Sequence, residues 1–314
     1  MTPYFSVVIP LYNKAQEITA TLSSVVAQIF TDFEIIIIND GSTDDSLNQI
    51  KIITDERIRI FTTKNKGVSH ARNFGIQKSK STRIAFLDAD DLWKPHHLKD
   101  LKLLFETYPN CGMYCKGYEK IIRDTIIRSH YKDIPEATHW QGIIENYFYH
   151  SQINSISTSS SIAVEKSIFN TIGNFNEHYT SGEDTDLWIR IALHYPTAFD
   201  TNVSATINLN ASQKLTHSLF TSRTHFDLTT FKKEELKNTS LKKYLDLNRY
   251  AIAMQYKLEN ETTLSKHSFE DIDLNNLSAL QKLIYHSPNY LTKNMLIFRN
   301  FLRKHGFNLR LFRL

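Results

Sequence analysis

The stretch FEIIIIND, Phe33 to Asp40, places four consecutive isoleucines before an Asn and an Asp. A β-branched run without polar alternation is typical of a strand whose two faces are both covered, as in a parallel sheet flanked by helices. The polar run that begins at its end, NDGSTDDS, marks the carboxyl end of that strand. This stretch therefore predicts an α/β fold in which Asp40 lies at a strand end.

Apolar runs and helix-like segments alternate on both sides of this stretch. Further strands are predicted at FSVVIP, IRIFTT and RIAFLD, and helical segments at residues 17–30, 46–54 and 68–78. Ligands of such folds bind at the carboxyl ends of the strands. The polar groups YNK, NDGSTDDS, KNKG and DADD fall at those ends. We therefore expect four strands to present side chains to one crevice.

The composition is that of a globular chain of 314 residues, with 41% hydrophobic and 12% aromatic residues. A formal net charge of +4 is too small over this length to indicate a nucleic-acid-binding protein. The N-terminus lacks the pattern of a secretory signal, and no window contains the roughly 18 apolar residues that cross a bilayer. Cys111 and Cys115 are too few for a disulfide framework or a zinc site, so we interpret them as reduced core thiols in a cytoplasmic protein.

The segment FLDADD, Phe86 to Asp91, puts three carboxylates within four residues after an apolar strand. Carboxylates crowded in this way repel one another, and a divalent cation removes that repulsion. Mg²⁺ and Mn²⁺ prefer hard oxygen ligands and usually take one or two protein carboxylates together with substrate phosphates and water. Asp88 and Asp90 suit such a metal. The alternative is a helix N-cap at Asp91 with the other two acids solvated.

Two further segments belong to the same predicted crevice. NDGSTDDS has Gly41 directly after Asp40, where a glycine permits a tight turn and the close approach of a ligand. NKGVSHARNFG offers Lys66, His70 and Arg72 around a helix start, a suitable place for a phosphate or a polar base edge. Ordinary turn and surface-helix chemistry explains each segment taken singly. Their order and their shared strand ends favour a ligand site.

Taken together, FSVVIPLYNK, IIIINDGSTDDS, NKGVSHARNFGI, FLDADD and VEKSIFNTIGNFNEHYTSGEDTDLWIRIA resemble a family 2 glycosyltransferase of the GT-A fold. The resemblance covers roughly Phe5 to Leu193. It implies an α/β fold with a mixed, mainly parallel sheet flanked by helices, a nucleotide-diphosphate-sugar donor, a divalent metal (Mn²⁺ or Mg²⁺), and transfer with inversion at the anomeric carbon.

The resemblance also implies roles for individual residues. Asp184, in the GED segment, corresponds to the catalytic base, which takes a proton from the acceptor hydroxyl opposite the leaving diphosphate. Asp90 corresponds to the main metal ligand, Asp88 to a ribose or metal contact, and Asp91 to a less certain third member. His217 is a looser match to a further metal ligand, and a surface or core histidine is its alternative. The residues implied in nucleotide-sugar binding are Pro10, Tyr12, Asp40, Arg72, Asp88 and Glu183.

The chain is predicted to divide into a GT-A domain, residues 1–220, and a basic helical extension, residues 221–314. Within the domain, residues 1–100 form the nucleotide-sugar half and residues 101–220 the acceptor half. The last thirty or so residues carry seven basic and no acidic side chains among apolar ones. Such a segment is typical of an interfacial membrane anchor, and equally of a terminal helix that packs on the body of the protein.

The function predicted from the resemblance is transfer of one sugar, with a UDP-hexose as the default donor. No QxxRW motif of processive members and no transmembrane bundle is found, so polymer synthesis coupled to export is not expected. A hydroxyl of a glycan or lipid-linked oligosaccharide in bacterial surface polysaccharide assembly, such as lipopolysaccharide or capsule, is the expected acceptor. The expected location is the cytoplasm, with contact to the inner face of the plasma membrane if the tail is an anchor. The alternative is a catalytically silent nucleotide-sugar-binding or scaffold subunit.

Overall fold

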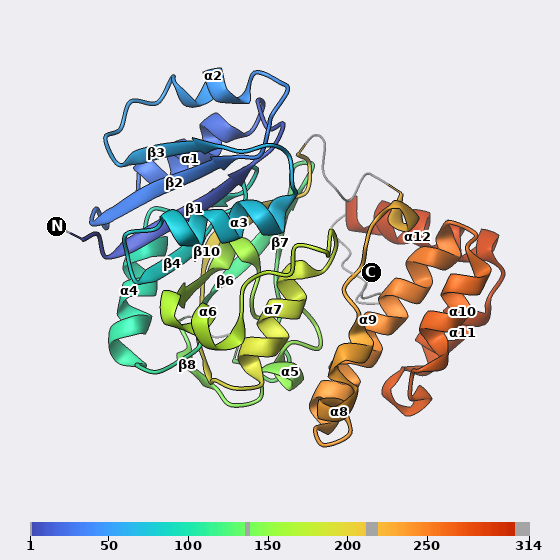
Figure 1. The fold of residues 1–314 in the computed structure, drawn as a ribbon. Helices are drawn as coiled ribbons and strands as arrows, with labels where there is room; N and C mark the ends of the chain where they lie inside the picture. The colour runs from blue at the N-terminus through green and yellow to red at the C-terminus, as the bar shows by residue number, and fades with distance from the viewer. Residues whose placement is uncertain (1, 136–138, 212–218, 305–314) are drawn as a thin grey trace. The chain divides into compact units, whose positions relative to one another are not determined.

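The computed structural model describes residues 2–135, 139–211 and 219–304 of the chain (Figure 1). It separates into two compact units. The first comprises Met1–Tyr147, Asn154–Leu215 and Thr224–Phe226, and the second Phe148–Ile153, Thr216–Arg223 and Asp227–Leu314. The first contains the β-sheet and the second is helical. The predicted functional division after residue 220 stays a prediction.

A ten-stranded mixed sheet forms the centre of the first unit as far as it is described. Its main path runs β3-β2-β1-β4-β9-β6-β10-β5, with β7 beside β6 and β8 beside β10. Strands β1 to β4 pair in parallel, whereas β9 is antiparallel to both β4 and β6. The strands are β1 Phe5–Leu11, β2 Phe33–Asn39, β3 Ile58–Thr62, β4 Arg83–Phe86, β5 Leu92–Trp93, β6 Met113–Ile122, β7 Thr125–Arg128, β8 Gln141–Ile144, β9 Ile162–Glu165 and β10 Thr197–Asn208.

Helices connect the parallel strands, as the alternating pattern predicts. Those that precede β10 in the chain are α1 Ile18–Val26, α2 Ser46–Ile50, α3 Val68–Lys78, α4 His97–Thr107, α5 Tyr147–His150, α6 Lys166–Ile172 and α7 Glu183–Ala192. Every residue of β1 and β2 is buried. Helix α3 lies so close to β1 that a Cβ on Gly75 would stand 2.3 Å from Val8 Cγ1. This close approach explains the glycine in the helix interior.

The register of the parallel strands brings their polar ends to one edge of the sheet. Leu11 pairs with Asn39 and Val8 with Phe86. The residues that follow these strands, including Tyr12, Asp40 and Asp88, therefore leave the sheet at the same edge. This register is the arrangement that the sequence-predicted crevice at the strand ends requires.

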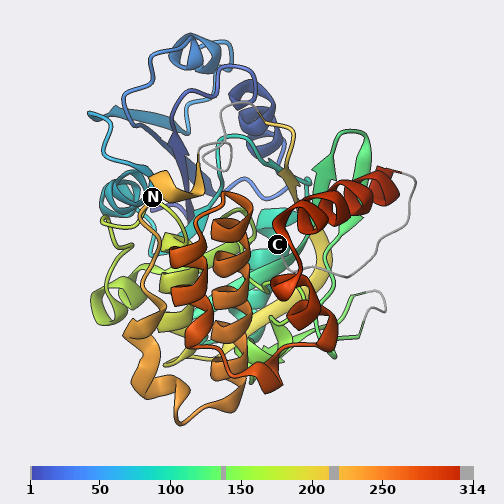
Figure 2. The ribbon, with the colours of Figure 1, turned by 90° about the vertical axis from the view of Figure 1, so that its right-hand side faces the viewer.

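The second unit is a helical assembly with its own apolar core. Its helices are α8 Lys232–Glu235, α9 Thr239–Leu258, α10 Thr262–Glu270, α11 Ala279–His286 and α12 Asn289–Lys304. Figure 2 shows α9 to α12 in orange to red. Tyr250 and Met254 of α9 form a buried cluster with Ile272 and with Ile284 of α11. Lys257 of α9 donates hydrogen bonds to backbone carbonyls at the end of α11, which satisfies acceptors that a helix C-terminus leaves open.

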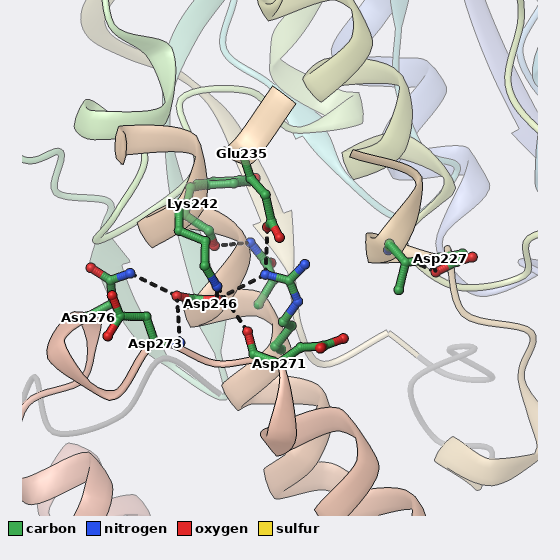
Figure 3. Close-up of polar contacts among 11 residues, drawn as sticks. Asp227, Glu235, Lys242, Asp246, Asp271, Asp273 and Asn276 are labelled. Atoms are coloured by element: carbon green, nitrogen blue, oxygen red, sulfur yellow. Dashed lines mark hydrogen bonds and ion pairs between the residues drawn. The ribbon is translucent and has the colours of Figure 1, made fainter. Parts of the chain in front are cut away.

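A buried carboxylate, Asp246 of α9, organises the polar contacts of this unit (Figure 3). It accepts hydrogen bonds from the side chains of Lys242 at 2.5 Å, Arg249 at 2.9 Å and Asn276 at 2.8 Å. The backbone amide of Asp273 donates a fourth at 3.2 Å. The carboxylate thus ties α9 to the segment between α10 and α11.

Two other predictions concern the cysteines and the membrane. Cys111 and Cys115 are both buried and unpaired with each other, as expected for core thiols. Burial raises the pKa of Cys111 to about 11 and that of Cys115 well above its ordinary value, which keeps both thiols protonated. Within the described segments, none of the helices combines the length and the apolar character that a bilayer span requires.

Candidate active site

Asp40 lies directly after β2 and is held by the loop that follows β3. Its carboxylate accepts hydrogen bonds from the hydroxyl of Thr63 and from the backbone amides of Lys66 and Gly67, at 2.7 to 3.1 Å. The next residue, Gly41, has φ +73°, and a Cβ there would stand 2.9 Å from Asn65 N. The predicted glycine turn is therefore present, and Asp40 joins two strand-end loops. Its contact with a nucleoside base stays a prediction.

Pro10 and Tyr12 stand on the neighbouring strand end. Pro10 is buried within β1 opposite Ile38, whereas the Tyr12 side chain just beyond the strand is 44% exposed. An exposed aromatic ring at a strand end is available to stack on a ligand. The structure thus brings Pro10, Tyr12 and Asp40 to the same sheet edge, and their predicted role in lining a nucleoside is compatible with this position.

Arg72 of α3 connects the two acidic segments of the site. Its guanidinium donates to Asp88 Oδ1 at 2.7 Å and to Glu183 Oε1 at 2.9 Å, and its side chain is only 4% exposed. Burial alone would lower the pKa of Arg72, but the carboxylates of Asp88 and Glu183 raise it above its ordinary value. The arginine is therefore a fixed charge between the end of β4 and the start of α7. Its partners in the structure are protein carboxylates.

Asp90 pairs with a basic residue from the loop after β1. Lys14 Nζ lies 2.9 Å from Asp90 Oδ2. Asp88 and Asp90, the metal ligands that the resemblance implies, are thus each paired with a protein cation. His217, the third predicted ligand, lies outside the described residues.

The donor set of Asp88 and Asp90 fits a divalent metal of the Mg²⁺ or Mn²⁺ type. Both supply hard oxygens, and these ions usually take one or two protein carboxylates with substrate phosphates and water. Among the described residues, no three His, Cys, Asp or Glu side chains gather closely enough to hold a metal by themselves. The site therefore suits an ion that arrives with a diphosphate, rather than one enclosed by protein ligands.

Asp91 differs from its two neighbours because it is buried and bonded to the protein. The hydroxyl of Ser160 donates to Asp91 Oδ2 at 2.6 Å, and the backbone amide of Asn208 donates to Oδ1 at 2.9 Å. Burial, followed by the charges of Asp88 and Asp90, raises the pKa of Asp91 to about 8. The proposed alternative of a helix cap at Asp91 is wrong, because α4 begins at His97 with His96 at its N-cap position.

Ser160 extends this arrangement to Asp88. Its hydroxyl oxygen also accepts a hydrogen bond from the backbone amide of Asp88 at 3.1 Å, and its carbonyl accepts one from the indole of Trp93 at 2.7 Å. A single buried serine therefore links Asp91 to the backbone of Asp88. Sequence reasoning missed Ser160, because a serine in the run SSS carries no motif and its partners lie about seventy residues away.

Glu183 and Asp184 open helix α7. Gly182 before them has φ +79°, and a Cβ there would stand 2.4 Å from the ring of Phe226, so this turn requires glycine. Burial, followed by the charge of Asp184, raises the pKa of Glu183. Asp184 accepts hydrogen bonds only from the adjacent Thr185 among the described residues, through its backbone amide at 2.6 Å and its hydroxyl at 3.2 Å.

Hydrogen bonds join the segment before α7 to helix α3. Asn73 exchanges hydrogen bonds with the backbone of Phe175, donating at 2.9 Å and accepting at 3.0 Å. His70 lies 3.1 Å from Glu177, whose other carboxylate oxygen accepts from Asn73 at 2.9 Å. These contacts hold the segment that leads into α7 against α3, the helix that also carries Arg72. His70 and Asn73 of NKGVSHARNFG thus also hold the segment before α7, an outcome that spacing alone did not predict, and the ligand contact of NKGVSHARNFG stays a prediction.

A family model for glycosyl transferase family 2 matches residues 6–170, more than half of the chain. The chain belongs to this family. The matched region includes the strand ends with Asp40, Asp88 and Asp90, and it stops before Asp184.

Several bacterial proteins are similar to this glycosyltransferase over its sheet-containing part. An uncharacterized glycosyltransferase of Rickettsia bellii is 36% identical over 193 residues, which cover 60% of this chain and 26% of that protein. One of Rickettsia felis is 33% identical over 193 residues, or 60% and 30% of the two chains. TuaG of Bacillus subtilis, named for teichuronic acid biosynthesis, is 34% identical over 149 residues, or 46% and 58%. The alignments thus span less than a third of the two Rickettsia proteins.

Among solved structures, the glycosyltransferase is similar to S. aureus TarS. The TarS structure in complex with UDP-GlcNAc superposes with a TM-score of 0.57 at 18% sequence identity, covering 88% of this chain and 72% of that one. Another structure of TarS residues 1–349 gives a TM-score of 0.55. This likeness confirms the predicted fold, a GT-A mixed α/β sheet with flanking helices and further helices toward the C-terminus.

Proposed function

We propose that this glycosyltransferase moves one sugar from a nucleotide-diphosphate sugar to an acceptor hydroxyl, with inversion at the anomeric carbon. The observation that carries the proposal is the separation of roles among the acids. Asp88 and Asp90 at the end of β4 are paired with cations in direct contact, whereas Asp184 at the start of α7 forms no direct ion pair among the described residues and interacts with Arg72 only through its charge. A carboxylate without a direct ion pair can take the proton of an acceptor hydroxyl, as inverting transfer requires.

In this mechanism Asp184 takes the proton of the acceptor hydroxyl as that oxygen attacks the anomeric carbon. Glu183, held by Arg72, stays beside it as a neighbour of the acceptor. Asp88 and Asp90 would hold a divalent cation, which would supply positive charge to the departing diphosphate. Because Arg72 bonds to both Asp88 and Glu183, it keeps the donor and acceptor sides of the site in a constant geometry.

A UDP-hexose is the donor that we propose, with Pro10, Tyr12 and Asp40 lining the nucleoside. The complex of TarS with UDP-GlcNAc supports a uridine nucleotide. The naming of TuaG for teichuronic acid biosynthesis supports a bacterial surface polysaccharide, or a lipid-linked precursor of one, as the acceptor. We propose lipopolysaccharide or capsule as examples of such a polysaccharide, and we place the reaction in the cytoplasm.

The decisive experiment measures donor binding and turnover with UDP-, GDP- and dTDP-sugars in Mn²⁺ or Mg²⁺. For wild type we expect one nucleotide to bind only with metal, and a product whose anomeric configuration by NMR is opposite to that of the donor. Asp90→Ala should abolish this binding, and Asp184→Asn should keep binding but lower turnover at least about 100-fold. Asp45→Ala, which removes an exposed acid of the neighbouring loop, is the control.

Absence of binding by any nucleotide-sugar with either metal would contradict the donor proposal. A catalytically silent scaffold subunit would then become the better description. Binding that is unaffected by Asp90→Ala would show that the metal lies elsewhere.

We further propose that α11 and α12 contact the anionic surface of the inner face of the plasma membrane. Tyr290, Leu291, Ile297 and Phe298 are exposed and repeat at seven-residue spacing, so they share one side of α12. The two helices and their connection, residues 279–304, contain basic but no acidic side chains. This combination favours an anionic lipid surface.

Vesicle sedimentation tests this contact. We expect the protein to bind vesicles containing phosphatidylglycerol, to release them in high salt, and to lose binding in Ile297→Ser/Phe298→Ser. Equal behaviour with purely zwitterionic vesicles, or no sedimentation with either, would favour a tail that packs on the protein.

A further inference from the structure

Lys14 lies where a cation would bind Asp90. Its ammonium is 2.9 Å from Asp90 Oδ2, and both side chains are only 12% exposed. A carboxylate this well shielded from water holds its partner more firmly than an exposed ion pair does. A divalent ion approaching Asp90 must therefore compete with a positive charge that the protein already supplies.

The position of Lys14 is built into the fold. The backbone amides of residues 13–15 donate in turn to the side chains of Ser42, Ser46 and Asp44, at 3.1, 2.8 and 3.0 Å. Ser42 and Asp44 belong to the loop after β2, and Ser46 is the first residue of α2. The loop after β1 is thereby fixed to the loop after β2, and Lys14 leaves it toward the end of β4. The segments that follow β1, β2 and β4 together place the Lys14 ammonium at Asp90.

One oxygen of the other acid is also paired with a protein cation. Asp88 Oδ1 is engaged by the buried guanidinium of Arg72, which also holds Glu183, and Asp88 keeps a second oxygen for a metal. Movement of Arg72 would leave the buried Glu183 without its cation, so Arg72 is the less mobile of the two bases. Lys14 is different, because a flexible ammonium with three donors can turn from a carboxylate to a phosphate.

We propose that Lys14 acts as a stand-in cation that excludes a bare divalent ion from Asp90, so that the metal enters only together with the donor diphosphate. When the metal and diphosphate arrive as one unit, the ion takes Asp90, and the displaced ammonium finds phosphate oxygens within reach. A bare ion brings no phosphate oxygens, so its binding would break the contact between Lys14 and Asp90 without supplying an anion in exchange. This inference rests on the proposed function and adds an order of binding to it.

The test is Mn²⁺ binding, followed by the EPR signal of the free ion, with and without UDP. For wild type we expect weak binding of Mn²⁺ alone and tight binding with UDP. Lys14→Met should increase the affinity for Mn²⁺ alone by about tenfold or more, because removal of one competing charge beside a carboxylate is a change of this order. Lys14→Arg, which keeps the charge, should restore weak binding.

Two further variants serve as controls. Lys51→Met removes an exposed ammonium next to α2 and should behave as wild type. Lys14→Gln, with a polar end, provides a second neutral variant in case Lys14→Met folds poorly, and it should resemble Lys14→Met.

The inference is overturned if Lys14→Met and Lys14→Gln bind Mn²⁺ alone within about twofold of wild type while UDP with Mn²⁺ still binds. It is also overturned if wild type binds UDP equally well without metal and the neutral variants lose that binding, because Lys14 would then replace the metal. If no chain binds Mn²⁺ with any nucleotide, the donor proposal itself fails, an outcome that is distinct from the other two.

Discussion

Two groups of charged side chains, one in each compact unit, differ in how completely their charges are paired. The helical cluster consists of Glu235 and Asp246 with Lys242 and Arg249, two acids and two bases. The strand-end cluster consists of Asp88, Asp90, Asp91, Glu183 and Asp184 with Lys14 and Arg72, five acids and two bases.

Buried acids of the two clusters differ in how well their negative charge is compensated. In the helical cluster the buried Asp246 accepts four hydrogen bonds, so its negative charge is fully compensated. In the strand-end cluster, burial and neighbouring acids raise the pKa of Asp91 to about 8 and also raise that of Glu183. A balanced cluster stabilises the fold, whereas an excess of negative charge is retained at a cost in stability and suits a cationic ligand.

The largest expected effect concerns the balanced cluster. Asp246→Asn should lower the free energy of unfolding by about 3 kcal/mol, because it leaves Lys242 and Arg249 with fewer counter-charges and removes one anchor of the segment at Asp273. Urea unfolding monitored by circular dichroism measures it. Asp227→Asn, an exposed capping acid in the same unit (Figure 3), should change the value by less than about 1 kcal/mol. Equal effects of the two substitutions would contradict the assignment of Asp246 as the organising acid.

Next in size is the effect of removing the buried serine of the strand-end cluster. Ser160→Ala deletes the bond to Asp91 and leaves the amide of Asp88 without its acceptor, a loss of about 1 to 3 kcal/mol. We expect donor affinity, measured by calorimetry with Mn²⁺, to fall about tenfold for the folded protein.

The neighbouring Ser159→Ala is the matched control for this prediction. Ser159 is also buried, but its hydroxyl has no hydrogen-bond partner within the described part of the chain. Its removal should therefore leave affinity unchanged. If Ser160→Ala lowers stability but not affinity, Ser160 supports the fold and does not position Asp88.

The smallest expected effect has the opposite sign to the first. Asp184→Asn should raise the free energy of unfolding of the ligand-free protein by up to about 1 kcal/mol, because it removes repulsion from the buried Glu183. The same urea titration detects it. A loss of stability similar to that of Asp246→Asn would mean that the strand-end acids are as well compensated as the helical ones, and the comparison would fail.

Much of the sheet-containing unit could be predicted from the sequence. The strands at Phe5, Phe33, Ile58 and Arg83 coincide with the apolar runs FSVVIP, FEIIIIND, IRIFTT and RIAFLD that predict them. Strand β5, Leu92–Trp93, was not predicted. It is two residues long and pairs with β10 more than a hundred residues later, so no local pattern marks it.

The sequence predicted where the acids and Arg72 lie along the chain, but not the charge pairs that they form. Asp40, Asp88 and Asp90 follow strands, and Asp184 lies in the first turn of α7, boundaries that are visible in the sequence. Arg72 bonds to Asp88 and Glu183, and its contact with a base or a phosphate stays a prediction. The pairing of Arg72 with Asp88 and Glu183 joins residues that are 16 and 111 positions apart in the sequence. A local sequence pattern does not predict contacts between such distant residues.

The sequence by itself determined the class of fold, the strand ends and the acids placed there, because hydrophobic periodicity and turn residues act over a few neighbours. Only the tertiary structure decided how these acids are compensated: Lys14 at Asp90, Arg72 between Asp88 and Glu183, and Ser160 beneath Asp91. The physical reason is that the stability of a charge depends on its surroundings in space. Burial and distance set those surroundings, and both arise only when distant segments of the chain pack together.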